Sequence, residues 1–204
     1  MLNSQVFADT LKRFTRKPGR LVVVSSPTAA GKTTICRALV RADKSCIQSI
    51  SCTTRALRGK EKHGKDYFFI SEKKFKEQIK KGFFLEWAKV HTSYYGTPSS
   101  FVAKHLKKGK NIILTIDVQG GKTVKKNFKD AILVFVLPPS FKEQERRLKH
   151  RGTEDRRCIK IRLKTAAKEL REIKNYEYLV INDTVGNAVS KIRSIITAEN
   201  TIIR

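Results

Sequence analysis

The chain has 204 residues, which fits one α/β domain with a small inserted lobe. Hydrophobic residues make up 40% of it, and its longest apolar runs fall well short of the roughly 20 residues that cross a bilayer, so no membrane span is predicted. The 44 Lys and Arg residues against 18 Asp and Glu leave a net charge of +26, which favours phosphate-bearing partners such as nucleotides or nucleic acid.

The N-terminal residues and the cysteines both suggest a reducing compartment. The first 20 residues are basic but contain no apolar stretch of the kind that marks a secretory signal, so we expect a cytoplasmic protein. The cysteines have neither a CxxC pair nor metal-ligand spacing, and we expect them to be free thiols that pack as small hydrophobic groups. They are Cys36, Cys46, Cys52 and Cys158.

Short apolar runs alternate with amphipathic stretches along most of the chain, a pattern typical of a parallel sheet covered by helices. Four runs are almost continuously apolar, as expected of strands buried on both faces. They lie at 21–25, 111–117, 132–137 and 178–181. Helices are predicted at 32–42, 120–127, 140–150, 158–174 and 185–199, with Ser140 and Thr184 as N-caps.

The pattern changes between residues 48 and 97. Aromatic-rich runs predict short strands at 67–70, 83–87 and 89–90, around one helix at 72–81. No repeat, Pro-rich linker or low-complexity tract separates this stretch from the rest. We therefore expect a small lobe that belongs to the same catalytic unit.

The first predicted strand leads through a loop at 25–34 directly into a helix. A phosphate cradle needs backbone N–H groups at a helix N-terminus, a Lys for the β- and γ-phosphates and a hydroxyl for Mg²⁺. Gly31, Lys32 and Thr33 supply these parts, although Ser26 stands where G-x-x-x-x-G-K-[ST] has its first Gly. The predicted ATP-binding residues are Ser26, Pro27, Thr28, Ala29, Ala30, Gly31, Lys32, Thr33 and Thr34.

Four further motifs, in order along the chain, resemble those of guanylate kinases. They are SISCTTRALRG at 49–59, HGKDYFF at 63–69, FLEWA at 84–88 and YYGT at 94–97. The resemblance extends over about residues 19–199. It implies a P-loop NTPase-type parallel sheet flanked by helices, in a single domain over 1–204. The core would span 19–47, 98–138 and 176–199, with a small mixed GMP-binding lobe at 48–97 and a helical lid at 139–175.

The residue types in these motifs suit a guanine nucleotide. A dianionic phosphate is well held by guanidinium forks and phenolic hydroxyls. Guanine presents N1–H and its N2 amino group as adjacent donors, so a selective pocket needs a carboxylate that accepts from both, and Glu86 is the candidate. The expected phosphate ligands are Arg55, Arg58, Tyr67 and Tyr95. The resemblance adds Ser51, Thr97 and Asp117 as contacts to the nucleotide.

Two more segments resemble parts of the family. In TIDVQG at 115–120, Thr115 replaces an acidic residue of the family pattern, so we expect Mg²⁺ to be held by Thr33, water and nucleotide oxygens. RRLKHRGTE at 146–154, followed by Arg162, resembles the lid. Positive groups should surround the migrating phosphoryl, whose charge is spread over three oxygens. The expected catalytic residues are Lys32, Arg55, Arg147, Arg151 and Arg162.

The resemblance implies ATP-dependent phosphorylation of GMP, with dGMP as a second acceptor and a role in GMP recycling within purine metabolism. We expect ATP and GMP as partners, Mg²⁺ as cofactor, weak non-specific polyanion binding and no obligate protein partner. Two other classes stay open: an inactive interaction module that binds a phosphorylated peptide, which the retained Gly31, Lys32 and Thr33 argue against, and a nucleic-acid-binding protein, for which we find no recognised motif.

Overall fold

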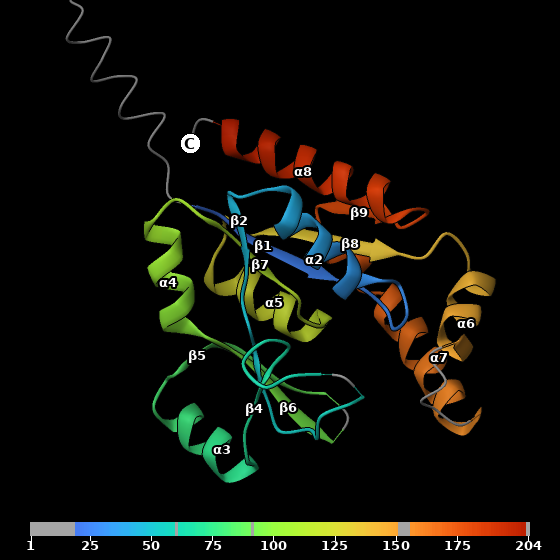
Figure 1. Cartoon of the computed structure of the whole chain (residues 1–204), viewed down its shortest axis with the longest axis horizontal. Coiled ribbons are helices and arrows are strands. Elements are labelled where there is room, and N and C mark those ends of the chain that lie inside the picture. The colour runs from blue at the N-terminus through green and yellow to red at the C-terminus, as the bar shows by residue number, and fades with distance from the viewer. Residues whose placement is uncertain (1–18, 60, 91, 151–155, 203–204) are drawn as a thin grey trace, which may run out of the picture.

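The computed structural model describes residues 19–59, 61–90, 92–150 and 156–202. Its core is a five-stranded sheet in the order β2-β7-β1-β8-β9, and all four neighbouring pairs are parallel. The strands are β1 (Leu21–Ser25), β2 (Cys46–Gln48), β7 (Asn111–Leu114), β8 (Ile132–Leu137) and β9 (Tyr178–Ile181). The predicted α/β class and parallel core are confirmed (Figure 1).

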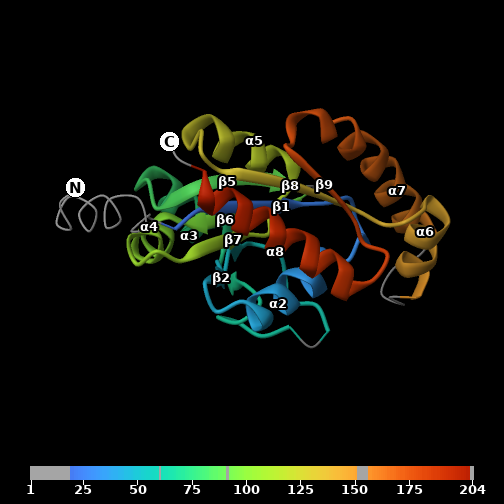
Figure 2. The same cartoon turned by 90° about the horizontal axis from the view of Figure 1, so that it is seen from above.

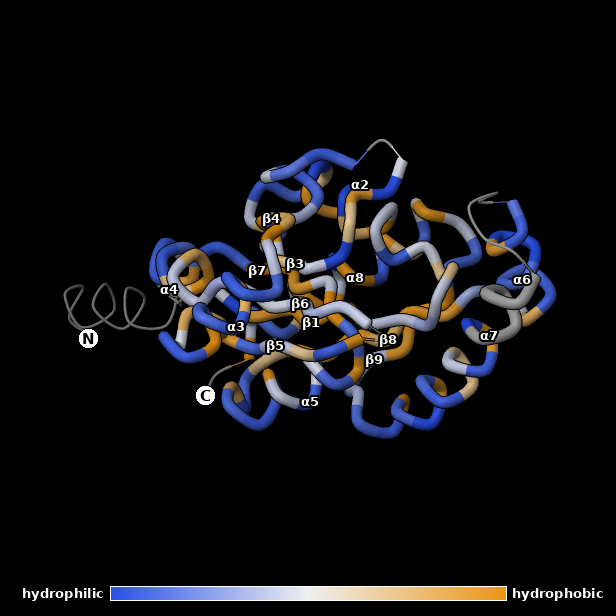
Figure 3. Tube along the Cα trace, turned by 90° about the horizontal axis from the view of Figure 1, so that it is seen from below, coloured by the Kyte–Doolittle hydropathy of each residue, from blue (hydrophilic) through white to orange (hydrophobic). Residues whose placement is uncertain are grey.

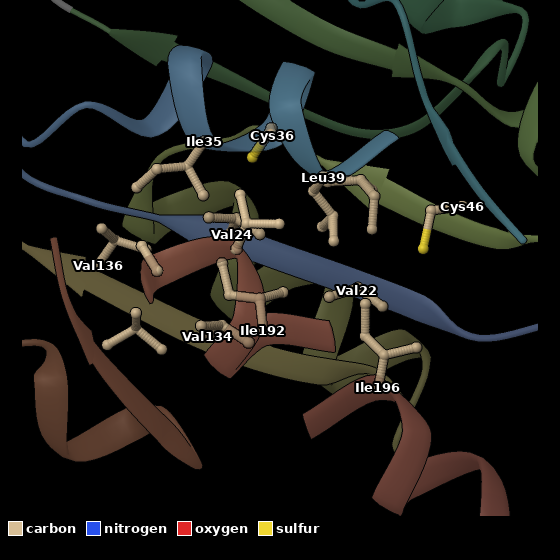
Figure 4. Packing of buried hydrophobic residues seen from close by; sticks show 14 of the residues in the cluster. Val22, Val24, Ile35, Cys36, Leu39, Cys46, Val134, Val136, Ile192 and Ile196 are labelled. Atoms are coloured by element: carbon tan, nitrogen blue, oxygen red, sulfur yellow. The ribbon is translucent and has the colours of Figure 1, made fainter. Parts of the chain in front are cut away.

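Helices cover both faces of this sheet (Figure 2). They are α2 (Lys32–Ala42) and α8 (Val185–Thr201) on one face, and α4 (Ser99–Lys107) and α5 (Val118–Asn127) on the other. Alternation along β1 explains the two cores, since Val22 and Val24 pack against α2 and α8 while Leu21 and Val23 face the other way (Figure 4). Figure 3 shows the resulting pattern, with apolar strands inside and largely polar helices outside.

A second, four-stranded sheet forms the lobe below the core in Figure 1. Its order is β4 (Phe68–Phe69), β3 (Cys52–Thr53), β6 (Ser93–Pro98) and β5 (Phe84–Val90), with α3 (Glu72–Lys80) beside it. The sheet is mixed, because β3 pairs with β4 in parallel and with β6 antiparallel. The expectation of separate strands at 83–87 and 89–90 was wrong, since β5 is one strand that pairs with β6 along its length.

Two helices, α6 (Phe141–His150) and α7 (Arg156–Leu170), lie together at one end of the molecule in Figure 1. The predicted caps are confirmed: the Ser140 hydroxyl accepts from the backbone N–H of Glu143, and that of Thr184 accepts from Asn187, both at 3.1 Å. The predicted bounds of the helix at 158–174 were wrong at both ends. The helix begins at Arg156 and ends at Leu170, before a 3₁₀ turn at Ile173–Asn175.

Two predicted bounds at the carboxyl end of β7 were wrong. The strand stops at Leu114 rather than at 117, and the next helix begins at Val118 rather than at 120. The cause is Asp117, whose Oδ1 accepts from the backbone N–H of Gly120 at 2.9 Å and so caps α5. Residues 115–117 therefore form a loop at the end of the sheet.

The described cysteines behave as predicted. Cys36, Cys46 and Cys52 are free and buried, and burial raises the pKa of the Cys36 thiol to about 12 and that of Cys52 to about 11, so neither is a reactive thiolate. The side chain of Cys158 lies outside the described residues. None of the helices that the structure describes has the length and apolar character needed to cross a bilayer.

Candidate active site

A cleft of about 270 Å³ opens at the carboxyl ends of the parallel strands, where α/β sheets commonly bind ligands. Four parts of the chain meet there: the loop after β1, the loop after β7, the mixed lobe and helix α7. The predicted site residues that line it are Ser26, Pro27, Thr28, Ala29, Ala30, Gly31, Lys32, Thr33, Ser51, Arg58, Tyr67, Glu86, Tyr95, Asp117 and Arg162.

The loop after β1 is shaped for an anion. Gly31 takes the left-handed conformation, with φ of 92°, and gives α2 no side-chain cap, so the first N–H groups of the helix are available to a phosphate. Two distant side chains hold the loop from outside. Asn182 Nδ2 donates to the carbonyl of Ala30 at 2.7 Å, and Gln144 Nε2 donates to that of Thr28 at 2.8 Å.

Ala29 departs from ordinary backbone geometry. Its φ is +61°, which makes it the one non-glycine residue with a positive φ in the part of the chain that the structure describes. This conformation is unfavourable for a residue with a Cβ and suits glycine better. The phosphate loop therefore keeps its shape at some cost in strain.

Lys32 reaches from the start of α2 to the loop after β7. Its Nζ donates to the carbonyl of Ile116 at 3.0 Å. Burial lowers the pKa of Lys32, while the nearby carboxylates of Glu169 and Asp117 act in the opposite direction. The cation therefore lies in a confined part of the cleft, where its interaction with an arriving phosphate is less screened than on the surface.

The carboxylate of Glu86 is directed into the cleft by the local strand geometry. A register shift between Phe84 and Glu86 interrupts the ladder of β5 and β6, and Glu86 then pairs directly with Thr97. The Thr97 hydroxyl donates to Oε1 of Glu86 at 2.6 Å. Glu86 is only 4% exposed, and burial raises its pKa to about 7.

Gly120 leaves room for this carboxylate. A Cβ at that position would lie 2.7 Å from Oε2 of Glu86, closer than packed atoms approach. The glycine at the start of α5 thus allows the lobe and the core to meet around Glu86. The cleft around this carboxylate also includes Ser51 from the lobe.

Aromatic and basic side chains gather on the lobe side of the cleft. The rings of Tyr67 and Tyr95 are 6.0 Å apart, edge to face, and the Arg55 guanidinium lies 5.0 Å from the centre of the Tyr67 ring. Arg58 lines the cleft together with both tyrosines. Arg55 instead lines an adjoining cavity of about 570 Å³, which it shares with Arg58 and Tyr67, and it is ion-paired with Glu61.

The lid residues differ in how close they come to the cleft. Arg162 lines it, with Nη1 at 3.5 Å from the Thr28 hydroxyl. Arg147 is not among the lining residues; its Nε donates to Glu143 at 2.7 Å and its Nη2 to the Asn182 carbonyl at 3.3 Å. Arg151 lies outside the described residues. Thr34, expected to contact ATP, is exposed and lies beside the cleft rather than in its wall.

Several polar side chains of the site were not predicted from the sequence. Glu169 and Thr165 line the cleft from α7, and Gln144 of α6 binds the phosphate loop. Glu169 is partly buried, and burial raises its pKa to about 7 although Lys32 opposes the shift. Its spacing of seven residues from Arg162, two helical turns, places it on the same face and was the available sequence signal.

The donor set fits a metal that arrives with a nucleotide. Within the described ranges no group of three or more His, Cys, Asp or Glu side chains could hold a metal ion by itself. The hydroxyl of Thr33 is exposed in the cleft at the first turn of α2. Mg²⁺ needs few protein ligands, since it keeps several waters and uses substrate phosphate oxygens.

Comparison with known proteins gives consistent matches over most of the chain. The family model described as guanylate kinase matches residues 18–199. A guanylate kinase of Caldanaerobacter subterraneus subsp. tengcongensis is 50% identical over 184 residues, which cover 90% of this chain and 89% of the relative. One from Thermotoga maritima is 41% identical over 181 residues, covering 89% and 87%. The crystal structure of guanylate kinase from Anaplasma phagocytophilum superposes with a TM-score of 0.78 at 30% identity, covering 91% of this chain and 88% of that one.

Proposed function

The chain belongs to the guanylate kinase family, and from that premise we propose that it transfers the γ-phosphoryl group of Mg·ATP directly to GMP bound in the same cleft. One observation carries the proposal. A phosphate loop with its Lys32 and the carboxylate of Glu86 line one cavity, and Thr97, which is fully buried, holds that carboxylate from behind. The first arrangement suits a nucleoside triphosphate, and the second suits the adjacent donors of guanine.

ATP is held in this account by the loop after β1. The N–H groups at the start of α2 and the ammonium of Lys32 bind the β- and γ-phosphates, and Arg162 approaches from the lid. Thr33 would hold Mg²⁺, which supplies positive charge to the phosphates when it is bound. Arg147 and Arg151 are assigned to the lid as further cations around the migrating group.

GMP is held by the mixed lobe. Glu86 accepts from N1–H and from the N2 amino group of guanine, with Thr97, Ser51 and Asp117 around the base. The phosphate is bound by Arg55, Arg58, Tyr67 and Tyr95, whose guanidinium and phenol groups match its oxygens. Because these contacts go to the base and the phosphate, removal of the ribose 2′-hydroxyl leaves them in place, and dGMP is proposed as a second acceptor.

The chemistry requires positioning rather than a general base. An ionised oxygen of the GMP phosphate forms a bond to the γ-phosphorus as the bond to the bridging oxygen breaks, and ADP takes the electron pair of that bond. Lys32 and Arg162 both line the cleft, and we assign them to the negative charge that is spread in this transition state. Closing of the lobe and the lid would exclude water and prevent wasteful ATP hydrolysis.

We also propose where in the cell this reaction takes place. Phosphorylation of GMP and dGMP is a step of purine nucleotide metabolism that recycles the monophosphate, and we place it in the cytoplasm.

An acceptor panel tests the proposed function. ADP formation from ATP is measured with GMP, dGMP, AMP, CMP or UMP as the second substrate. We expect fast turnover with GMP and dGMP and little with the others, since adenine offers no pair of donors to Glu86. Equal turnover with all acceptors would contradict the proposed role of Glu86 in selecting guanine. Absence of turnover with GMP, together with tight binding of a phosphorylated peptide, would identify the chain as an interaction module instead.

A further inference from the structure

The carboxylate of Glu61 joins two arginines of the loop between β3 and β4. Nη1 of Arg55 donates to Oε2 of Glu61 at 2.7 Å, and Nη2 donates to Oε1 at 2.6 Å. The backbone N–H of Arg58 donates to Oε2 at 2.9 Å. One side chain thus holds the guanidinium of the first arginine and the backbone of the second, and both arginines are assigned above to the GMP phosphate.

The hydrogen bonds of Arg55 define which part of its guanidinium faces a ligand. The two hydrogens of Nη1 are used by Glu61 and by the carbonyl of Ala56, at 2.8 Å. Glu61 therefore takes the outer edge, formed by Nη1 and Nη2. The Nε edge is a second two-hydrogen fork that can bind another anion, and Arg55 also interacts with the hydroxyl of Tyr67, a second expected phosphate ligand. A guanidinium bound in this way can hold two anions at once.

The Arg55 side chain is also fixed by packing. Its guanidinium carbon lies 5.0 Å from the centre of the Tyr67 ring and 5.5 Å from that of Phe69. The side chain is 10% exposed, against 24% for Glu61. Arg55 lowers the pKa of Glu61, mainly through their hydrogen bonds, so the carboxylate stays ionised at neutral pH.

We propose that Glu61 is a positioning residue for the GMP phosphate: it holds Arg55 by the outer edge of the guanidinium so that the Nε edge is presented to the phosphate, and it fixes the backbone at Arg58. The inference rests on the proposed function. Its physical basis is preorganisation, because a long flexible side chain that is ordered before the ligand arrives loses less conformational entropy on binding. The gain outweighs the repulsion between Glu61 and the phosphate, since the charge of Arg55 lies between them.

The experiment compares Glu61→Gln and Glu61→Ala with the wild type. The Gln variant keeps the shape and one oxygen for the backbone N–H of Arg58, so the loop can still fold. We expect both variants to raise KM for GMP by about 10-fold or more, while KM for ATP changes less than about 2-fold. Glu72→Ala is the matched control, because it removes an exposed ion pair with Lys76 in the same lobe, away from the cleft.

A double-mutant cycle separates positioning from simple stabilisation of the loop. If Glu61 acts through Arg55, then Glu61→Gln produces no further increase in KM for GMP when Arg55 is already Ala. Additive effects of the two changes would overturn the inference, and so would an unchanged or lower KM for GMP in Glu61→Gln, since a lower value would mean that Glu61 competes with the phosphate.

Calorimetric titration with GMP makes the result independent of turnover. A wild type that binds GMP without phosphorylating it would contradict the proposed function, and the GMP affinities of the variants would still decide the role of Glu61. A wild type with no affinity for GMP would overturn both.

Discussion

The hydroxyl of Thr97 donates to Oε1 of Glu86 at 2.6 Å, and the two residues face each other across strands β5 and β6. This bond fixes the orientation of a carboxylate that is almost fully buried. The remaining acceptor positions of the carboxylate are then available to the paired donors of guanine. Under the proposed function, recognition of the base would therefore depend on one cross-strand pair of the mixed sheet.

Exchange of the carboxylate for an amide tests this recognition. Glu86→Gln presents an N–H₂ group where an acceptor is required, and we expect it to weaken use of GMP by about 1–3 kcal/mol in kcat/KM. KM for ATP should stay close to the wild-type value. Glu145→Gln, at an exposed ion pair with Lys149 on α6, is the control. Equal losses for both nucleotides would mean that Glu86 is structural.

The raised pKa of Glu86, about 7, predicts opposite effects of pH on binding and stability. In the proposed function the ionised carboxylate of Glu86 binds guanine, so KM for GMP should fall as pH rises from 6.5 to about 8. The folded state favours the protonated form of Glu86, so the free energy of unfolding should decrease as pH rises between about 4.5 and about 7. Glu169 contributes to stability in the same direction. Steady-state kinetics on the wild type and Glu86→Gln isolate the first effect, and a profile that is identical in the two proteins would refute it.

The left-handed conformation of Ala29 predicts an unusual response to glycine. Ala29→Gly should raise the free energy of unfolding by up to about 1 kcal/mol, because relief of strain exceeds the entropy that glycine adds to the unfolded chain. The neighbouring Ala30→Gly, where φ is not positive, should lower it by about 0.5–1 kcal/mol. Denaturant titrations of the pair provide the measurement. Similar destabilisation by both changes would argue against strain at Ala29.

Sequence patterns located the parallel core and the phosphate loop because both are local signals: continuous apolar runs in β1 and β8, and a strand-loop-helix order around Lys32. Strand β6 was missed because its sequence, SYYGTP, contains Gly and Pro, which disfavour strands, and its pairing with β5 overrides that preference. Helix α4 was missed as well, since Val102 is its one fully buried residue.

The site residues also fall into two groups, those with a local sequence signal and those whose role depends on contacts in the folded chain. Glu86 was predicted because guanine chemistry requires a carboxylate and a motif supplied one, and it lines the cleft. Glu61 and Glu169 were not, because the partner of each, Arg55 for one and Lys32 for the other, becomes visible only when the chain is folded. Charge interactions within one loop, as for Glu61, or between a lid helix and the phosphate loop, as for Glu169, depend on how the folded chain brings the two groups together.

The net charge of +26 predicts weak, non-specific binding of polyanions beside the proposed kinase activity. The cleft and lid use only a few basic residues, so most of the 44 create a field around the surface that should bind polyanions without sequence preference. Gel shifts with random-sequence nucleic acid should weaken by orders of magnitude between ~50 and ~200 mM salt. Tight, sequence-selective binding that survives the higher salt would instead establish nucleic-acid recognition as a function.

The most direct test of the account is the initial rate of ADP formation with ATP and GMP together, with each nucleotide alone, and in Lys32→Ala. We expect ADP from the wild type only when both nucleotides are present, and a loss of about 100-fold or more in Lys32→Ala with GMP binding retained, since Lys32 is assigned to ATP and not to GMP. Lys104→Ala, on the exposed side of α4, should behave as the wild type. ADP formation that does not depend on GMP, or near-normal turnover in Lys32→Ala, would contradict phosphoryl transfer in this cleft.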